Sequence, residues 1–305
     1  MPTNKRARSG RPSQRRGQSP RYVEPVLDPT WSSAYGPSPE ERLDNKEALR
    51  RTLLKQSRGV MATGLLIGVA AVPLLTAAAH FSVVISITAA LLIIGGSLLF
   101  VNQRLRAIEG RLSTVASNFV ASFLPGGAVR ERQRLTTIVA RLSATFGLSD
   151  VSSFVVDDAM YNGALVPNGN GFSLFVTSGV MSDFDLLELE GVVAHLMARE
   201  RLGQLERVTA SALLGSDGLR AAELAGVGST YRADEVAAAA IRHPMGLASA
   251  LSKCSLQTMV PGSFFAGEKY CESRWVWFNV HADRSEIEWG DLDDVSLRSR
   301  ALAEW

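Results

Sequence analysis

The chain has only two cysteines and four histidines in 305 residues, and aromatic residues make up 7% of it. Cys254 and Cys271 are too few for a disulfide framework or for a zinc site built from cysteines. The sequence also lacks a glycine-rich phosphate loop, a nucleophile elbow and a C-x-x-C pair. These absences give no support to a nucleotide-binding protein, an α/β-hydrolase or a thiol redox enzyme.

Charge is missing from one long stretch of the chain. Between Gly59 and Gln103 there is no Asp, Glu, Lys or Arg, and His80 is the only ionisable residue. About 20 helical residues cross the ~30 Å apolar layer of a membrane, so this stretch is long enough for two spans. We expect them at 59–79 and 81–101, with a turn around His80. Because both segments are apolar on all sides, the sequence predicts a transmembrane hairpin.

Basic residues flank both ends of the predicted hairpin. They are Arg50, Arg51, Lys55 and Arg58 before it and Arg104, Arg106 and Arg111 after it. Such flanks favour the cytoplasmic side. The expected location is therefore the cell membrane, as a multi-pass protein with two spans in the lipid bilayer and both termini cytoplasmic. No apolar run occurs early enough for a cleaved signal peptide.

The residues before the hairpin divide into two parts. Residues 1–37 are basic, rich in Ser, Pro and Gly and poor in large aliphatic residues, which predicts a disordered tail. Its charge suits anionic lipid or nucleic acid, but no groove-reading motif accompanies it, so nucleic acid is not an expected partner. Residues 38–58 are predicted to form a juxtamembrane helix, since Ser38 and Glu41 form a capping box and Pro39 suits the first turn.

Residues 104–305 are predicted to form one cytosolic α+β domain, mainly helical with a small β-sheet. Gly163–Val166 and Phe172–Thr177 are expected to pair as a hairpin, because Asn-Gly between apolar runs is a strong turn signal. The remaining expected elements are a strand at 153–156 and helices at 130–146, from Ser182 or Asp183 onward, at 230–240 and from Pro244 through the run 246–254.

Short motifs follow one another in this domain in a recognisable order. They lie at 155–158, 161–164, 176–181 and 189–195, and more faintly at 294–302, which contains an Arg. This series resembles the membrane-anchored zinc endopeptidases of the HtpX and CAAX-prenyl-protease type, over roughly residues 104–255. The resemblance implies a zincin-like fold, a sheet edge that receives substrate and a helix that carries H-E-x-x-H.

The resemblance also implies a zinc site, and the sequence departs from it. His195 occupies the position of the first ligand, but Leu196 replaces the general base and Arg199 the second ligand. Thr230 replaces the third ligand, while the Asp that holds a ligand histidine is retained as Asp234. Leucine does not accept a proton and a guanidinium does not bind zinc. We therefore expect no catalytic residue and no metal cofactor here.

Three structural expectations follow for this altered site. His195 is expected to be a half-buried helix histidine. Arg199 is expected to pair with Asp234, so that an ion pair joins the two helices as zinc would. Trp277 and Phe278 are expected in a half-buried strand.

The predicted function is that of a catalytically inactive peptidase homologue, a pseudopeptidase, which binds or regulates a membrane protein or peptide at the membrane. The expected peptide-binding edge contains Phe172, Leu174 and Val176, since an extended peptide adds to a sheet edge.

Two alternatives remain open. One is an active membrane zinc metalloendopeptidase in protein quality control, with non-standard ligands such as His243, His281 or Asp234. The other is a structural membrane protein whose basic tail binds lipid or nucleic acid.

Overall fold

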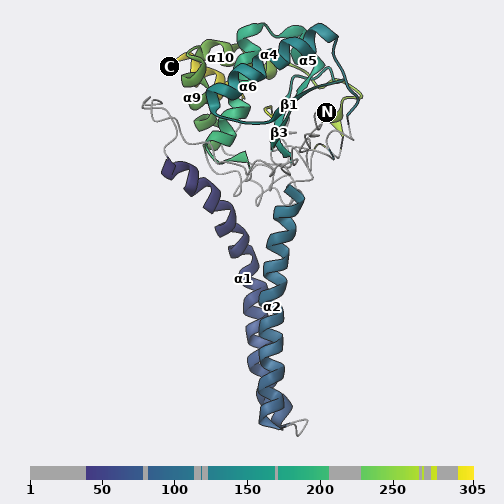
Figure 1. Cartoon of the computed structure of the whole chain (residues 1–305), viewed down its shortest axis with the longest axis vertical. Coiled ribbons are helices and arrows are strands. Elements are labelled where there is room, and N and C mark those ends of the chain that lie inside the picture. The colour runs from purple at the N-terminus through teal and green to yellow at the C-terminus, as the bar shows by residue number, and fades with distance from the viewer. Residues whose placement is uncertain are drawn as a thin grey trace, which may run out of the picture.

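Two long helices form a stalk, and the remaining helices and strands form a rounded body at one end of it (Figure 1). The computed structural model describes residues 39–77, 82–112, 118, 123–168, 171–205, 228–267, 270, 276–279 and 295–305. The predicted basic tail at 1–37, the turn residue His80 and His281 lie outside these ranges.

The stalk consists of α1 (Pro39–Ala77) and α2 (Val83–Leu112). Helix α1 begins at Pro39 as predicted, and it joins the expected juxtamembrane helix and the first apolar segment into one element. The apolar stretches long enough to cross a membrane are Ser57–Ala77 and Val83–Gln103, within about two residues of the predicted spans. Only 11% of each stretch is buried, which is unlike the core helix of a water-soluble domain.

The two stalk helices pack closely through small residues. A Cβ atom on Gly68 would lie 2.7 Å from Cγ1 of Ile94 and 3.2 Å from the carbonyl oxygen of Ala90. A Cβ atom on Gly64, one turn earlier, would lie 2.1 Å from Oγ of Ser97. Small residues spaced four apart let helix backbones approach closely, so these glycines set the distance between α1 and α2.

The body begins with α4 (Val129–Phe146), which ends at Gly147 in the left-handed conformation, with φ 65°, as predicted. A three-stranded sheet follows, formed by β1 (Val151–Val156), β2 (Gly163–Asn168) and β3 (Gly171–Thr177). Strands β2 and β3 are antiparallel with Asn168 opposite Gly171, which confirms the predicted hairpin.

The helices after the sheet are α5 (Ser178–Asp183), α6 (Leu186–Arg201), α9 (Ser229–Ile241), α10 (Pro244–Leu256) and α12 (Val295–Ala303), with the short 3-10 helix η1 (Phe264–Ala266). The predicted single helix from Ser182 is in fact two helices. Asp185 caps α6, because its side chain accepts from the amide of Glu188 while Glu188 accepts from the amide of Asp185. This capping box stops α5 from continuing into α6.

The strand order is β1-β3-β2, so β3 lies in the middle of the sheet. It pairs with β1 in parallel and with β2 in antiparallel orientation. The prediction that Phe172, Leu174 and Val176 lie at a peptide-binding edge is therefore wrong. Their side chains are buried in the core between the sheet and the helices, and both sides of the β3 backbone are paired.

The two faces of the sheet are covered differently. Alternate residues of a strand point to opposite faces, and those on one face pack in the main core with α4, α6, α9 and α10. The other face carries a second cluster in which Phe175 packs with Phe265, Tyr270 and Trp277. Trp277 and Phe278 are fully buried, not half-buried as predicted.

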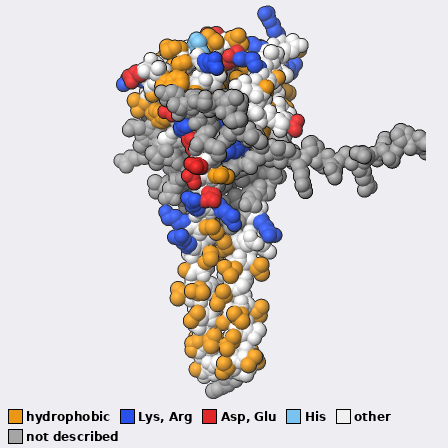
Figure 2. Space-filling view, turned by 60° about the vertical axis from the view of Figure 1, so that its left-hand side comes forward, with side chains coloured by type: hydrophobic (Ala, Val, Ile, Leu, Met, Phe, Trp, Pro, Cys, Tyr) orange, Lys and Arg blue, Asp and Glu red, His pale blue; other side chains and the backbone are white. Residues whose placement is uncertain are grey.

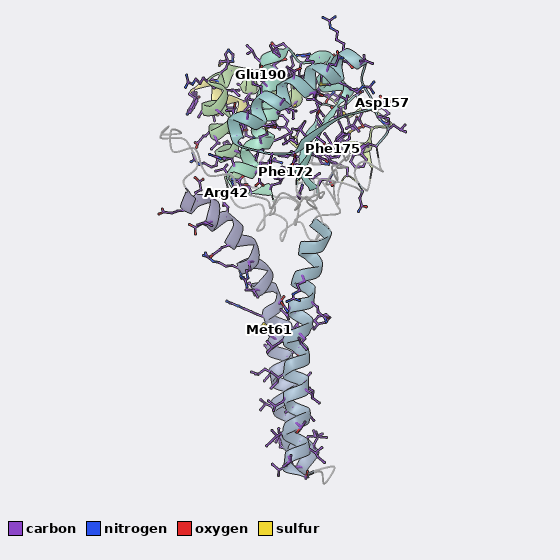
Figure 3. The ribbon with its side chains drawn as sticks, in the orientation of Figure 1. Arg42, Met61, Asp157, Phe172, Phe175 and Glu190 are labelled. Atoms are coloured by element: carbon purple, nitrogen blue, oxygen red, sulfur yellow. The ribbon has the colours of Figure 1, made fainter. Side chains whose placement is uncertain are left out.

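The start of α1 contacts the body directly, near the labelled Arg42 in Figure 3. Arg42 forms a buried ion pair with Glu200 of α6 at 3.0 Å, and Asn45 donates to the carbonyl of Leu202. On α9, Arg232 binds both carboxylate oxygens of Glu41, at 2.9 and 3.0 Å. Such paired hydrogen bonds fix orientation as well as distance, so α1 is held against α6 and α9.

We expect Gly68→Leu to destabilise the stalk by about 1–3 kcal/mol, because overpacking forces the helices apart. Gly96→Leu is the matched control, since nothing lies within 4 Å of a Cβ atom there. The measurement is the unfolding free energy of the detergent-solubilised chain, followed by circular dichroism. Equal stabilities of the two variants would show that Gly68 does not set the helix spacing.

Candidate functional site

Helix α6 presents two functional candidates on one side, one turn apart. His195 and Arg199 are separated by four residues and therefore lie on the same helix face. Both are buried, as is nearly all of α6 from Leu189 to Arg201. A histidine and an arginine in such an interior need specific partners, because unpaired polar groups are costly away from water.

The first partner is Asp234, which α9 brings next to His195. Nδ1 of His195 lies 2.6 Å from Oδ1 of Asp234, and both side chains are inaccessible to solvent. The sequence grouped these two residues at one altered site, with Arg199 as the expected partner of Asp234; in the structure Asp234 contacts His195. The expectation of a half-buried histidine is wrong, since His195 is fully buried.

Arg298 of α12 completes the site. Its Nε donates to Oδ2 of Asp234 at 2.7 Å, and its Nη2 donates to Oδ1 at 2.9 Å. Its guanidinium also lies 5.3 Å from the ring centre of Phe278. Asp234 thereby joins three helices, α6, α9 and α12, through one buried carboxylate.

Burial and charge set the protonation of this group. Burial raises the pKa of Asp234, but the positive charge of Arg298 and the contact with His195 outweigh it, so this pKa lies well below its ordinary value. The pKa of His195 is lowered to about 3, mainly because the ring is buried. The negative charge of Asp234 offsets part of this decrease, whereas the positive charges of Arg199 and Arg298 add to it. Around neutral pH, Asp234 is an anion and His195 is uncharged.

These states fix the tautomer of His195. An ionised carboxylate only accepts hydrogen bonds, so Nδ1 of His195 carries the proton and donates it to Asp234. Nε2 then has a lone pair, and this buried atom has no hydrogen-bond partner among the described residues. Histidines that bind metals commonly have this arrangement, with a carboxylate on the other ring nitrogen.

Arg199 has different partners from those expected. Its Nη1 donates to the carbonyl of Val276 at 2.9 Å and its Nη2 to the carbonyl of Trp277 at 3.3 Å. The predicted pairing of Arg199 with Asp234 is wrong, because Arg298 occupies the carboxylate instead. Arg199 joins α6 to the segment at 276–279.

The two remaining altered positions are also buried. Leu196 lies beneath β2, where a Cβ atom on Gly163 would be 3.2 Å from its Cδ1. Its side chain is thus part of the core that supports the sheet. Thr230 lies one turn before Asp234 on α9 and is buried there.

The residues present do not fit the zinc site that the resemblance implies. A hydrolytic zinc needs three protein ligands and an open position for water. Nε2 of His195 is one suitable donor, but Asp234 is already bound by Arg298 and His195. The fixed positive charge of Arg199 lies one turn away. Within the described ranges, no group of three His, Cys, Asp or Glu residues could hold a metal.

Among the alternative ligands in the described part of the chain, His243 is not brought to this site. His243 is the N-cap of α10, where its Nδ1 accepts from the amide of Gly246 at 3.1 Å. Of the two alternatives that the structure describes, Asp234 contacts His195 and His243 does not. His281 lies outside the described residues.

Two residues that matter at the site were not selected from the sequence. Arg298 lies within 294–302, the stretch that resembles the closing segment of the family with its Arg, which was a usable signal. Asn162 lies in the motif at 161–164, but its role depends on a residue 117 positions away: its side chain binds both the amide and the carbonyl of Asn279.

Comparison of the chain with models of protein families, with curated proteins and with solved structures finds no match. Any inference about function therefore depends on the residues and geometry of this chain.

We expect Arg298→Gln to destabilise the body by about 3–5 kcal/mol, because it leaves the buried Asp234 without its cation. Arg300→Gln is the matched control, since Arg300 lies on the same helix and is exposed. The measurement is thermal unfolding of the full chain, in which this loss corresponds to a midpoint about 10 °C lower. A midpoint equal to that of the control would contradict the role given to Arg298.

Proposed function

We propose that this chain is a membrane-anchored homologue of zinc endopeptidases that has lost hydrolysis and acts by binding. The observation that supports the loss of hydrolysis is that Arg199 donates hydrogen bonds to the carbonyls of Val276 and Trp277. Its guanidinium stands four residues after His195, where the family has a metal ligand, and it is fixed by two main-chain carbonyls.

Membrane anchoring is supported by the surface of the stalk. Its large aliphatic side chains point outward, with Leu66 69% exposed and Leu92 71% exposed. On the face in Figure 2, hydrophobic side chains cover the stalk, and Lys, Arg, Asp and Glu side chains gather where it meets the body. An apolar surface of this extent is stable in lipid and not in water. Basic residues beside it suit the cytoplasmic headgroups, so both termini are proposed to be cytoplasmic.

Kinship with the zinc endopeptidases is supported by the contact between α6 and α9. The resemblance implies that an Asp on the later helix holds a histidine of the H-E-x-x-H helix, and Asp234 contacts His195 in this way. We infer a binding role because the residues that hydrolysis needs are replaced. Leu196 does not activate water, and the buried charges are used to hold the fold together.

The rival proposal is an active zinc enzyme. One observation favours it: Nε2 of His195 has no hydrogen-bond partner among the described residues, and the ring has the tautomer that suits a metal. The rival needs two more ligands next to that atom, and the described residues supply none.

Membrane insertion predicts a specific effect of charge on the stalk. Leu66→Asp combined with Leu92→Asp should release the chain from membranes during alkaline carbonate extraction, since each charge at a span centre costs about 2.5–3.5 kcal/mol. Leu54→Asp, on α1 before the apolar stretch, should stay in the membrane pellet with the unaltered chain. Recovery of the unaltered chain in the soluble fraction would refute membrane anchoring.

Loss of hydrolysis predicts the metal content. The full chain, purified from cells supplied with zinc, should contain far less than one zinc per molecule by elemental mass spectrometry and should not cleave unfolded casein. His195→Ala and the matched control His243→Ala should leave both results unchanged. Stoichiometric zinc that is lost in His195→Ala and kept in His243→Ala would establish the rival enzyme instead.

A further inference from the structure

The body end of the stalk carries a group of exposed cations. Lys55 and Arg58 belong to α1 and Arg106 belongs to α2, and all three side chains are exposed. The apolar stretches of the two helices end beside them, at Ser57 and Gln103. On the face in Figure 2, Lys and Arg side chains lie directly above the hydrophobic surface of the stalk. These cations therefore mark the boundary between the apolar stalk and the polar part of the molecule.

The packing of the stalk places the cations of its two helices at nearly the same height. Helices α1 and α2 run in opposite directions (Figure 1), and Gly64 packs against Ser97. Equal numbers of residues lead from Gly64 back to Lys55 and from Ser97 on to Arg106. Lys55 and Arg106 therefore lie at about the same height on different helices, and Arg58 lies one turn nearer the apolar stretch.

Lys55 and Arg58 repel each other. Residues three apart are neighbours on one face of a helix, so like charges at these positions are destabilising. Arg51, one turn further from the apolar stretch, pairs with Glu47. Among the described residues, neither Lys55 nor Arg58 has an ion pair or a side-chain hydrogen bond of this kind. An anion from outside the chain would remove the repulsion between them.

The depth of these cations indicates which anion this is. The headgroup layer on each side of the ~30 Å apolar layer is about 5–7 Å thick. Lys55 lies two residues before the apolar stretch and Arg58 lies in its first turn. At 1.5 Å per residue, both lie within or next to the headgroup layer. Helical side chains point toward the helix N-terminus, so the side chain of Arg58 extends away from the apolar layer and toward the phosphates.

We propose that Lys55, Arg58 and Arg106 together bind the headgroup phosphates of anionic phospholipids at the body end of the stalk. This inference rests on the proposed membrane anchoring and goes beyond it, because it names the class of lipid that the chain selects. A headgroup with a net negative charge is attracted by all three cations. A zwitterionic headgroup carries its own ammonium group near the phosphate, so its attraction is much weaker.

The test is the lipid preference of the full chain in phosphatidylcholine vesicles, measured by electron paramagnetic resonance with a trace of spin-labelled lipid. Lipid in contact with the stalk moves slowly, so the slow fractions of labelled phosphatidylglycerol and labelled phosphatidylcholine give their relative affinities. We expect about a fivefold preference for phosphatidylglycerol at low salt. At about 1 M NaCl the preference should fall below about twofold, because salt screens the attraction.

Two pairs of substitutions on α1 separate the position of the charge from its amount. Lys55→Gln combined with Arg58→Gln should lower the preference to about twofold, since Arg106 alone remains. The matched control is Arg50→Gln combined with Arg51→Gln. It removes the same charge about 9–11 Å before the apolar stretch, beyond the headgroup layer, and should keep the fivefold preference. Lys55→Arg combined with Arg58→Lys preserves the charge and should keep the preference too.

Arg106→Gln is an independent variant on the other helix. It should lower the preference by about half, and it decides the question if the double variant at 55 and 58 does not fold. Equal preferences in the two Gln double variants, or a preference that persists at high salt, would refute binding by these three cations.

The unaltered chain also separates this proposal from the one on which it rests. If it has slow lipid but no preference for phosphatidylglycerol, the selection of anionic lipid is refuted and membrane anchoring is kept. If no slow lipid of either kind is detected, the stalk is not in the bilayer, and both proposals are refuted.

Discussion

The buried carboxylate of Asp234 is the interaction on which the rest of the body depends. It binds His195 from α6 and Arg298 from α12, while its own helix is α9, so one side chain joins three helices. Its pKa stays well below the ordinary value, because the charge of Arg298 outweighs the cost of burial. A carboxylate held as an anion in this way needs its cation to remain, since a lone buried charge is strongly destabilising.

The same group links the helices to the sheet. Arg298 and Arg199 bind the carbonyls of the segment at 276–279, and that segment lies along β2. The arginines therefore serve as backbone-binding groups in the position where the resemblance places a metal. Exchange of a metal ligand for a guanidinium keeps a positive charge at the site but replaces Lewis-acid chemistry with hydrogen-bond donation. In the proposed function, this exchange is the physical reason for binding without hydrolysis.

The stalk and the body are joined next to this site. Helix α1 contacts α6 through the buried pair of Arg42 with Glu200, and it contacts α9 through Arg232 with Glu41. These are the two helices that carry His195 and Asp234. The first half of α1 thus fixes how the body is oriented on the apolar helices.

Local patterns were enough for much of this structure. The uncharged stretch from 59 to 103, Pro39, Gly147 and the Asn-Gly turn placed the stalk helices, the end of α4 and the β2–β3 hairpin, because each acts on neighbours in the chain. The ordered motifs placed His195 and Asp234 at one altered site, but the partner expected there for Asp234 was Arg199. Only the tertiary structure decided that β3 is central and that Arg298, not Arg199, pairs with Asp234. Two arginines offer the same chemistry in a sequence, and the choice between them is made by which helix the packing brings within hydrogen-bond distance.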